Sequence, residues 1–267
     1  MFMTLKFPRT DMDRRRFLAA AAGSGVATAV AGCLASASPS PPDVPEDRLE
    51  SDGWGLVEEE KAEAFSESIA GAELTATATT RTYENEPLRS ELAEKTLGEV
   101  TDAPVSFFAS RITFDPDLTD LPGGVGGGQI LDEVETNVRA TLEAQMAAHG
   151  VEEIEKVGTD TLTVDAGMEA RQTDLEGVVP FEPVSFPAAD GAPVAIEMDD
   201  IVVVGRMAVW RVDGSVLVGG GAFPAENVET SVEEDLSSAI SVAIDVDLGL
   251  EPDRYAEDLF DLIRAIE

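Results

Sequence analysis

The sequence predicts an α+β domain with a mostly antiparallel sheet and helices packed on that sheet, an arrangement of the α/β sandwich type. Two observations lead to this prediction. Along residues 53–267 the hydrophobic pattern switches repeatedly between the spacing of a helix and the alternation of a strand. In addition, Asp213-Gly214 joins two alternating apolar segments, as in a hairpin of antiparallel strands.

In the first half of that segment, the predicted elements alternate between helix and strand. Val57, Phe65 and Ile69 are spaced by multiples of four residues, which indicates one face of a helix. A second helix begins at Pro87, a residue suited to the first turn, and a strand ends before Pro116. In chain order we expect a helix over 58–69, a strand over 73–83, a helix over 87–97 and a strand over 105–114.

The second half opens with the clearest helix of the sequence. Ile130, Val134 and Val138 recur every four residues, and Gly150 supplies a stop signal. Asp165-Ala166-Gly167 is a tight connection between two of the strands that follow. In chain order we expect a helix over 130–148, strands over 152–157, 161–164, 168–173, 201–212 and 215–222, and helices over 230–244 and 252–266.

The N-terminal segment has the order of a cleaved export signal: a cationic head, a weakly apolar stretch and small residues before a cysteine. A membrane-spanning helix is the alternative, but it needs roughly 20 predominantly apolar residues. The stretch from Phe17 to Gly32 has only 16 residues and is rich in Ala and Gly. We therefore expect a signal peptide. Its start is one of three methionines, Met1, Met3 and Met12.

Two short motifs give this signal a type. The run from Arg14 to Leu18 resembles the core of twin-arginine signal peptides, although Asp13 stands where Ser or Thr is usual. The run from Val30 to Cys33 resembles the lipobox of prokaryotic lipoproteins, in which Leu is commonest at the place of Val30. The resemblance implies recognition by the twin-arginine translocase and a lipid anchor that holds the protein on the outer face of the cell membrane. The residues implied are Arg14, Arg15, Phe17 and Leu18 for export and Cys33 for lipid attachment.

The interpretation as an exported lipoprotein divides the chain into three parts. Residues 1–32 are the signal peptide with its lipobox, and residues 33–52 are a lipid-anchored tether rich in Ser and Pro. Residues 53–267 are long enough to bury a core and form a single α+β domain. Because Cys33 is the only cysteine, the exported chain is expected to hold no disulfide and no thiolate metal site.

The charge of the chain is strongly negative, with 53 acidic and 18 basic residues, a net charge of -35 and a pI of about 4.1. Removal of residues 1–32 takes away five basic and two acidic residues, which leaves a net charge of -38. The only lysines that remain are Lys61, Lys95 and Lys156. Such acid-rich, lysine-poor surfaces resemble those of haloarchaeal proteins, because molar salt screens the repulsion between carboxylates.

The distribution of the acidic residues separates a solvated surface from a specific acidic site for a cation or a basic partner. The acids are spread along the chain and form only short runs, such as Glu58-Glu59-Glu60. A solvated surface is therefore the preferred interpretation. Nucleic acid is not expected as a partner, because binding to phosphates needs clustered Lys or Arg.

The motifs that could carry chemistry are incomplete. Gly123 to Gly128 lies where a phosphate loop would lie, but no Lys-Ser or Lys-Thr follows it. Asp115 to Asp120 resembles the start of a calcium loop but lacks its glycine and its final glutamate. His149, the only histidine, stands beside Gly150 as in a helix cap, and no Gly-x-Ser-x-Gly elbow occurs. No catalytic residue, metal ligand or cofactor is therefore assigned.

Three residues form a candidate ligand-binding group in a chain with few cations: Arg206, Trp210 and Arg111. Period-two alternation places Arg206 and Trp210 on one face of a strand. If that face were concave and open, the two could hold an anionic or aromatic ligand. The preferred alternative is an arginine stem packed on Trp210, with an ion pair to an acidic residue of a neighbouring strand.

The order of elements loosely resembles the PsbP-like photosystem proteins and small mycobacterial-type lipoproteins of the same fold. The hairpin from Val209 to Gly214, followed by Val216 to Gly221, resembles haloarchaeal twin-arginine-exported lipoproteins of unknown function. The resemblance implies a surface lipoprotein with a binding or accessory role in the cell envelope, together with a ligand or envelope partner that the sequence does not identify. A carboxylate-based extracellular hydrolase and a structural envelope spacer are the alternatives.

Overall fold

The structure is a computed structural model that describes residues 40–69, 72–95, 104–119, 127–180, 184–187, 193–196, 200–237 and 240–267. The elements below belong to one compact unit, Pro39–Glu267. The helices are α2 (Glu46–Asp52), α3 (Glu86–Lys95), α4 (Gly127–Ala148) and α5 (Pro252–Arg264). The strands are β1 (Trp54–Ile69), β2 (Ala72–Asn85), β3 (Ser106–Asp115), β4 (Glu152–Thr163), β5 (Glu169–Val179), β6 (Val184–Pro187), β7 (Pro193–Ile196), β8 (Ile201–Val212), β9 (Ser215–Pro224), β10 (Glu229–Ser237) and β11 (Ile240–Asp247).

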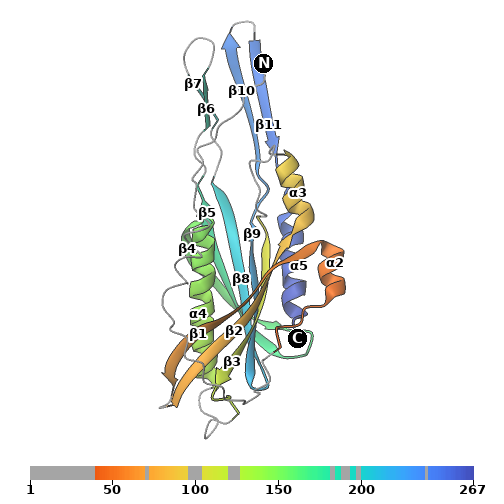
Figure 1. Cartoon of the computed structure of the whole chain (residues 1–267). Helices are drawn as coiled ribbons and strands as arrows, with labels where there is room; N and C mark the ends of the chain where they lie inside the picture. Colours follow the sequence, from red (N-terminus) through yellow and green to blue (C-terminus); the bar gives the residue numbers. More distant parts are fainter. Residues whose placement is uncertain are drawn as a thin grey trace, which may run out of the picture. The chain divides into compact units, whose positions relative to one another are not determined.

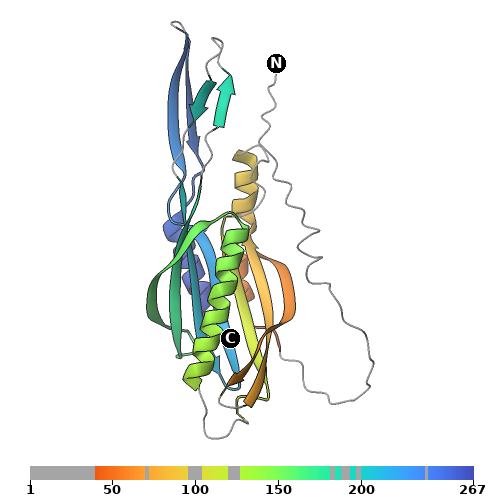
Figure 2. The same ribbon diagram turned by 90° about the vertical axis from the view of Figure 1, so that its left-hand side faces the viewer.

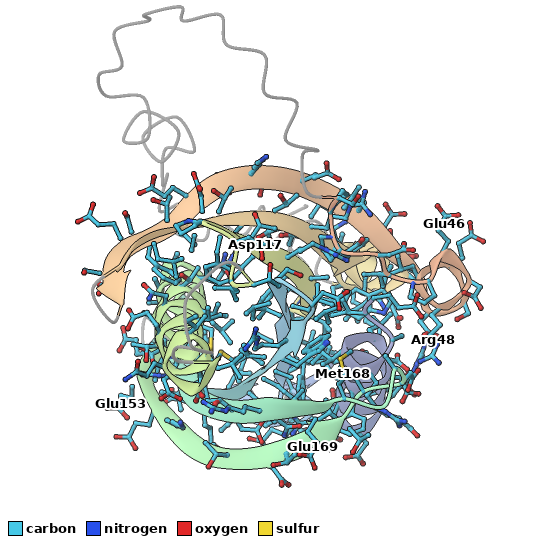
Figure 3. All side chains as sticks on the ribbon, turned by 90° about the horizontal axis from the view of Figure 1, so that it is seen from below. Glu46, Arg48, Asp117, Glu153, Met168 and Glu169 are labelled. Atoms are coloured by element: carbon cyan, nitrogen blue, oxygen red, sulfur yellow. The ribbon has the colours of Figure 1, made fainter. Side chains whose placement is uncertain are left out.

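Seven strands form one antiparallel sheet in the order β1-β2-β3-β9-β8-β5-β4. The sheet is strongly curved, with α4 on one face and α5 on the other (Figure 3). The predicted α+β class, with a mostly antiparallel sheet covered by helices, is therefore confirmed. The predicted hairpin around Asp213-Gly214 is also confirmed, because β8 pairs with β9 from Val203↔Pro224 to Val212↔Ser215, and Asp213 takes the positive φ of 51°.

Each face of the sheet has its own core, called here the α4 face and the α5 face after its helix. Along β8, Met207 and Val209 belong to the α4 core, whereas Ala208 and Trp210 belong to the α5 core, as period-two alternation predicts. From α4, the α4 core takes Ile130, Val134, Leu142 and Met146. From α5, the α5 core takes Tyr255, Leu259, Leu262 and Ile263, and Ile266 follows just beyond the helix.

Two predicted helices are strands in the structure. Residues 58–69 lie in β1, which pairs with β2 from Trp54↔Asn85 to Ile69↔Ala72. Residues 230–237 and 240–244 lie in the paired strands β10 and β11. For residues 58–69 the reason is a shared parity, because a spacing of four residues also returns to the same side of a strand, so the spacing of Val57, Phe65 and Ile69 did not separate helix from strand.

Other boundaries also differ from the sequence prediction. The strands expected over 152–157 and 161–164 are one strand, β4, with irregular pairing between Glu152 and Glu155 and between Lys156 and Gly158. The elements α2, β6 and β7 were not predicted. The predicted helices over 87–97, 130–148 and 252–266 correspond to α3, α4 and α5, and the strands over 73–83 and 105–114 correspond to β2 and β3.

Residues 42–53 pack on the domain and form a segment called here the strap. Asp43 and Glu267 exchange two backbone hydrogen bonds of 2.8 and 2.9 Å. Val44 and Leu49 are buried in the α5 core. The tether predicted over 33–52 therefore does not extend to residue 52, because Val44 and Leu49 give this Pro-containing segment enough apolar surface to pack.

Two hairpins leave the sheet at the same end. The β6–β7 hairpin is inserted between β5 and β8, which pair at that end through Val179↔Ile201. The β10–β11 hairpin follows β9, whose Pro224 pairs with Val203 near the same end. Figures 1 and 2 show the two hairpins extending from the end of the sheet where α5 begins. The strap contacts Glu267, which lies just beyond the other end of α5.

Candidate functional site

The residues predicted for export and lipid attachment, Arg14, Arg15, Phe17, Leu18 and Cys33, lie outside the described residues. None of the described helices is both long enough and apolar enough to span a bilayer. What the structure gives is the point at which the chain that follows Cys33 joins the domain. That point is Asp43, because its backbone is bonded to Glu267 and Val44 beside it is buried.

Arg206 forms an ion pair across two neighbouring strands. Its Nε donates a hydrogen bond of 2.8 Å to Oδ1 of Asp174, the residue opposite it on β5. Gln172 Nε2 donates to the same carboxylate at 3.1 Å. The Arg206 and Asp174 side chains are only 22% and 23% exposed. The structure thus contains the cross-strand ion pair that the sequence offered as the alternative to ligand binding.

Trp210 and Arg111 lie in one row across the α5 face, because Leu217 of β9 pairs with both of them. Trp210 is 1% exposed and belongs to the α5 core. Arg111 Nη2 donates a hydrogen bond of 2.9 Å to the main-chain oxygen of Glu267. Arg111 therefore fastens the segment after α5, and the structure does not bring Arg206, Trp210 and Arg111 to one open surface.

A polar cluster that the sequence did not reveal lies on the α4 face, where α4 runs beside β5 and the edge strand β4. Glu135 of α4 is at its centre. Glu135 Oε1 accepts hydrogen bonds from Thr173 Oγ1 at 3.1 Å and from Lys156 Nζ at 3.4 Å. Its Oε2 lies 3.8 Å from Arg171 Nη1, and Arg171 also pairs with Asp132 on the preceding turn of α4. The carboxylate of Glu135 is thus held from three sides.

An open hollow of about 360 Å³ lies beside this cluster. Its lining is entirely polar: Glu135, Thr159, Asp160, Thr161, Arg171 and Gln172. Thr159 and Thr161 pair with Thr173 and Arg171, so their side chains lie on the side of the sheet that carries α4. Both threonines are exposed at the edge of the sheet. The hollow is therefore bounded by α4 on one side and by the β4–β5 ribbon on the other.

The hollow can donate and accept hydrogen bonds but carries little net charge. The Arg171 guanidinium and the two threonine hydroxyls are donors, whereas Glu135 and the same hydroxyls are acceptors. The positive charges of Arg171 and Lys156 are offset by Asp132 and Glu135, and Asp160 of the lining adds one negative charge. In a chain with 53 acidic residues, nothing in the sequence distinguished Asp132 and Glu135 as members of a site. The scarcity of cations was the one available signal, since Lys156 is one of three lysines after residue 32.

Away from the hollow, the surroundings of Asp117 and Asp258 shift the pKa of each of these carboxyl groups. Oδ1 of Asp117 accepts hydrogen bonds from the hydroxyl and the backbone N–H of Thr119, and these bonds lower the pKa of Asp117. This geometry agrees with a turn as the interpretation of the segment that starts at Asp115. On α5, burial raises the pKa of Asp258, and the negative charge of Asp52 in α2 raises it further.

The remaining sequence motifs take structural places. His149 is exposed at the end of α4, where its backbone N–H donates to Gln145 O at 3.1 Å, and Gly150 follows with a φ of 86°. This is the cap expected from the sequence. In the glycine-rich run, Gly123 to Gly126 lie outside the described residues, whereas Gly127 and Gly128 begin α4. Within the described ranges, no three His, Cys, Asp or Glu residues are grouped so that they could hold a metal ion.

Comparison with known proteins gives one match. No curated protein and no solved structure matches the chain, so the resemblance to PsbP-like proteins stays a prediction. A domain of unknown function, DUF6517, matches residues 41–267. The match begins one residue before the strap and ends at Glu267, so it covers the whole sheet, both helical layers and the polar hollow. The chain therefore belongs to the DUF6517 family.

Proposed function

We propose that this chain is a twin-arginine-exported lipoprotein of a halophilic archaeon, anchored through Cys33 on the outer face of the cell membrane. Its domain has a binding or accessory role in the cell envelope. The observation that best supports this proposal is the attachment of the strap. Because Asp43 is bonded to Glu267, only nine residues lie between Cys33 and the point where the chain is fastened to the folded domain. Such a segment spans at most about 35 Å, so a lipid on Cys33 would keep the domain close to the membrane.

The charge distribution supports a saline environment. The exposed edge strand β1 carries Glu58, Glu59, Glu60 and Glu63, and each of these side chains is exposed. Of these, Glu59 has a cation partner, since Arg81 Nε donates to its carboxylate at 2.8 Å. Unscreened carboxylates at this density repel one another, and molar salt shortens the range of that repulsion to about 3 Å.

Replacement of Cys33 tests the anchor. In a halophilic archaeal host, Cys33→Ser should release the folded protein into the medium, because no lipid can be attached. The measurement is fractionation into medium, cytoplasm and membrane. Ala31→Ser is the control variant, since it leaves Cys33 in place. Retention of the Cys33→Ser protein in membranes after a high-salt wash would overturn the lipoprotein assignment.

Replacement of Arg14 and Arg15 by Lys tests the export route. The double variant should accumulate as an uncleaved precursor in the cytoplasm, because the translocase reads the arginine pair. Arg9→Lys is the matched control, as it changes an arginine of the same head outside the motif. Normal appearance of the double variant at the cell surface would contradict the twin-arginine route without touching the lipid anchor.

A further inference from the structure

We propose that the hollow between α4 and the β4–β5 ribbon binds the hydroxyl groups of a neutral saccharide. This inference rests on the binding role proposed above and names the class of ligand. The hollow of about 360 Å³ lies at the small end of the range of ligand pockets, which fits a unit of one or two sugar rings. The residues that line it are all polar, and those on the side of the sheet that carries α4, together with Glu135, present groups that pair with hydroxyls.

The first argument is the preorganisation of the acceptor. Glu135 accepts hydrogen bonds from Thr173 and Lys156, and its second oxygen faces Arg171. The Glu135 side chain is only 19% exposed, and Thr173 is fully buried. A carboxylate fixed in this way loses little conformational entropy when it accepts a hydroxyl, which favours binding.

The second argument is the arrangement of donors and acceptors. Thr159 and Thr161 are two residues apart on one side of the edge strand, so their hydroxyls stand in a row about 7 Å long beside Glu135. A hydroxyl group can donate to Glu135 and accept from Arg171, whereas a sulfate ester or a fully ionised phosphate ester can only accept. The threonine hydroxyls can serve either role. This mixed set of partners matches neighbouring hydroxyls on a sugar ring.

The third argument is charge. Arg171 is paired with Asp132 and faces Glu135, so its positive charge is already offset. The surrounding chain carries a net charge of -35. An anionic ligand would therefore be repelled by the surface and would find no free cation in the hollow. A neutral ligand avoids that cost, and at molar salt its hydrogen bonds are not screened as ion pairs are.

The test is saccharide binding to the full chain at molar KCl, measured by ligand-observed NMR with methyl α-glucoside, methyl α-mannoside and methyl β-galactoside. Glucose 6-sulfate and glycerol are the comparison ligands. At least one methyl glycoside should bind with a Kd in the millimolar range, and more tightly than either comparison ligand. The variant Thr159→Val/Thr161→Val keeps the side-chain volume but removes both hydroxyls, and it should weaken binding about tenfold.

Thr163→Val is the matched control, because Thr163 is exposed on the same side of β4 but does not line the hollow. Its affinity should equal that of the unchanged chain. The proposal is overturned if no methyl glycoside binds, if glucose 6-sulfate binds more tightly, or if the two threonine variants behave alike. Cell fractionation is not part of this measurement. Failure of saccharide binding would therefore leave the anchor proposal standing, and failure of the anchor would leave the hollow's binding intact.

Discussion

On the α5 face the helix lies almost directly on the backbone of the sheet, whereas on the α4 face polar side chains separate helix and sheet at one edge. Gly219 and Gly221 of β9 make the close approach on the α5 face possible. A Cβ at Gly219 would lie 2.4 Å from Ile266 Cδ1, and a Cβ at Gly221 would lie 2.9 Å from Leu259 Cδ1. The strap covers the same face with Val44 and adds apolar area to its core.

The α4 face has an apolar centre and a polar margin. Val134 and Met146 are buried in its core, but Glu135, next to Val134 in sequence, joins the ion pairs at the β4 edge. β4 is the edge strand of the seven-stranded sheet, and this margin is open as the hollow. The α5 face therefore serves mainly for stability, whereas the polar margin of the α4 face is open and is the place where we propose that a ligand binds.

We expect the largest effect on stability from a change in salt concentration. The same experiment tests whether the α4 face and the α5 face unfold together. Trp54 and Trp210, the two tryptophans of the chain, both belong to the α5 core, so their fluorescence reports on that face. Lowering salt from about 1 M to ~0.1 M extends the repulsion between carboxylates from about 3 Å to about 10 Å. We expect cooperative loss of structure, with fluorescence and circular dichroism changing in one transition.

The measurement is a KCl titration at neutral pH, repeated with sucrose to separate screening from general exclusion effects. Loss of helical signal before the tryptophan change would mean that the α4 face unfolds independently. An equal melting temperature at both salt concentrations would instead show that the acidic surface is no adaptation to brine.

Next in size is Gly221→Val on the α5 face. A Cβ at this position would lie 2.0 Å from the backbone oxygen of Ser106, a distance that only a shift of the strand can relieve. We expect the free energy of unfolding to fall by at least about 3 kcal/mol. Gly128→Ala at the start of α4 is the control, because no atom lies within 4 Å of its added Cβ. Urea denaturation at molar salt gives both values, and equal stability of the two variants would contradict close packing on the α5 face.

A smaller effect is expected from Thr173→Val, which tests the polar margin of the α4 face. Thr173 is fully buried, and its hydroxyl donates to Glu135 at 3.1 Å. The substitution keeps the volume but removes one donor to a carboxylate, so we expect a loss of about 1 kcal/mol. Thr161→Val, exposed on β4, should change the free energy of unfolding by less than about 0.5 kcal/mol. Equal effects of the two substitutions would mean that the Glu135 cluster does not stabilise the fold.

The sequence predicted the α5 face better than the polar margin. Leu259, Leu262 and Ile263 include a three-residue step, which only a helix places on one face, so α5 was found. In β1, by contrast, Phe65 and Ile69 are four residues apart, a spacing that helix and strand share. Pairing with β2 then decided between them.

The hollow could not be predicted, because it depends on contacts between distant segments. Glu135 and Thr173 are 38 positions apart, and Thr161 reaches the hollow only through its pairing with Arg171. Period-two alternation correctly predicted that Arg206 and Trp210 lie on the same side of β8. It could not show that α5 and the segment after it cover Trp210, because that covering is a tertiary contact.

The smallest predicted effect concerns Asp258, a carboxyl group of α5 whose side chain is only 18% exposed. Burial raises the pKa of Asp258, the charge of Asp52 in α2 raises it further, and Arg254 opposes both effects, with its Nε 3.6 Å from Oδ2. Because the folded pKa exceeds the unfolded one, the stability that protonation of Asp258 provides is complete below the unfolded pKa. It is lost as pH rises through the folded pKa.

Asp258→Asn imitates the protonated form, so it should raise the free energy of unfolding at neutral pH, by less than about 1 kcal/mol. The difference from the unchanged chain should shrink on acidification. Asp253→Asn, exposed in the first turn of α5, should instead lower stability slightly, because it removes a negative charge from the helix N-terminus. Thermal melts across a pH series at molar salt measure both variants. A gain for Asp258→Asn that is constant with pH would show that packing, and not the charge of Asp258, sets its effect.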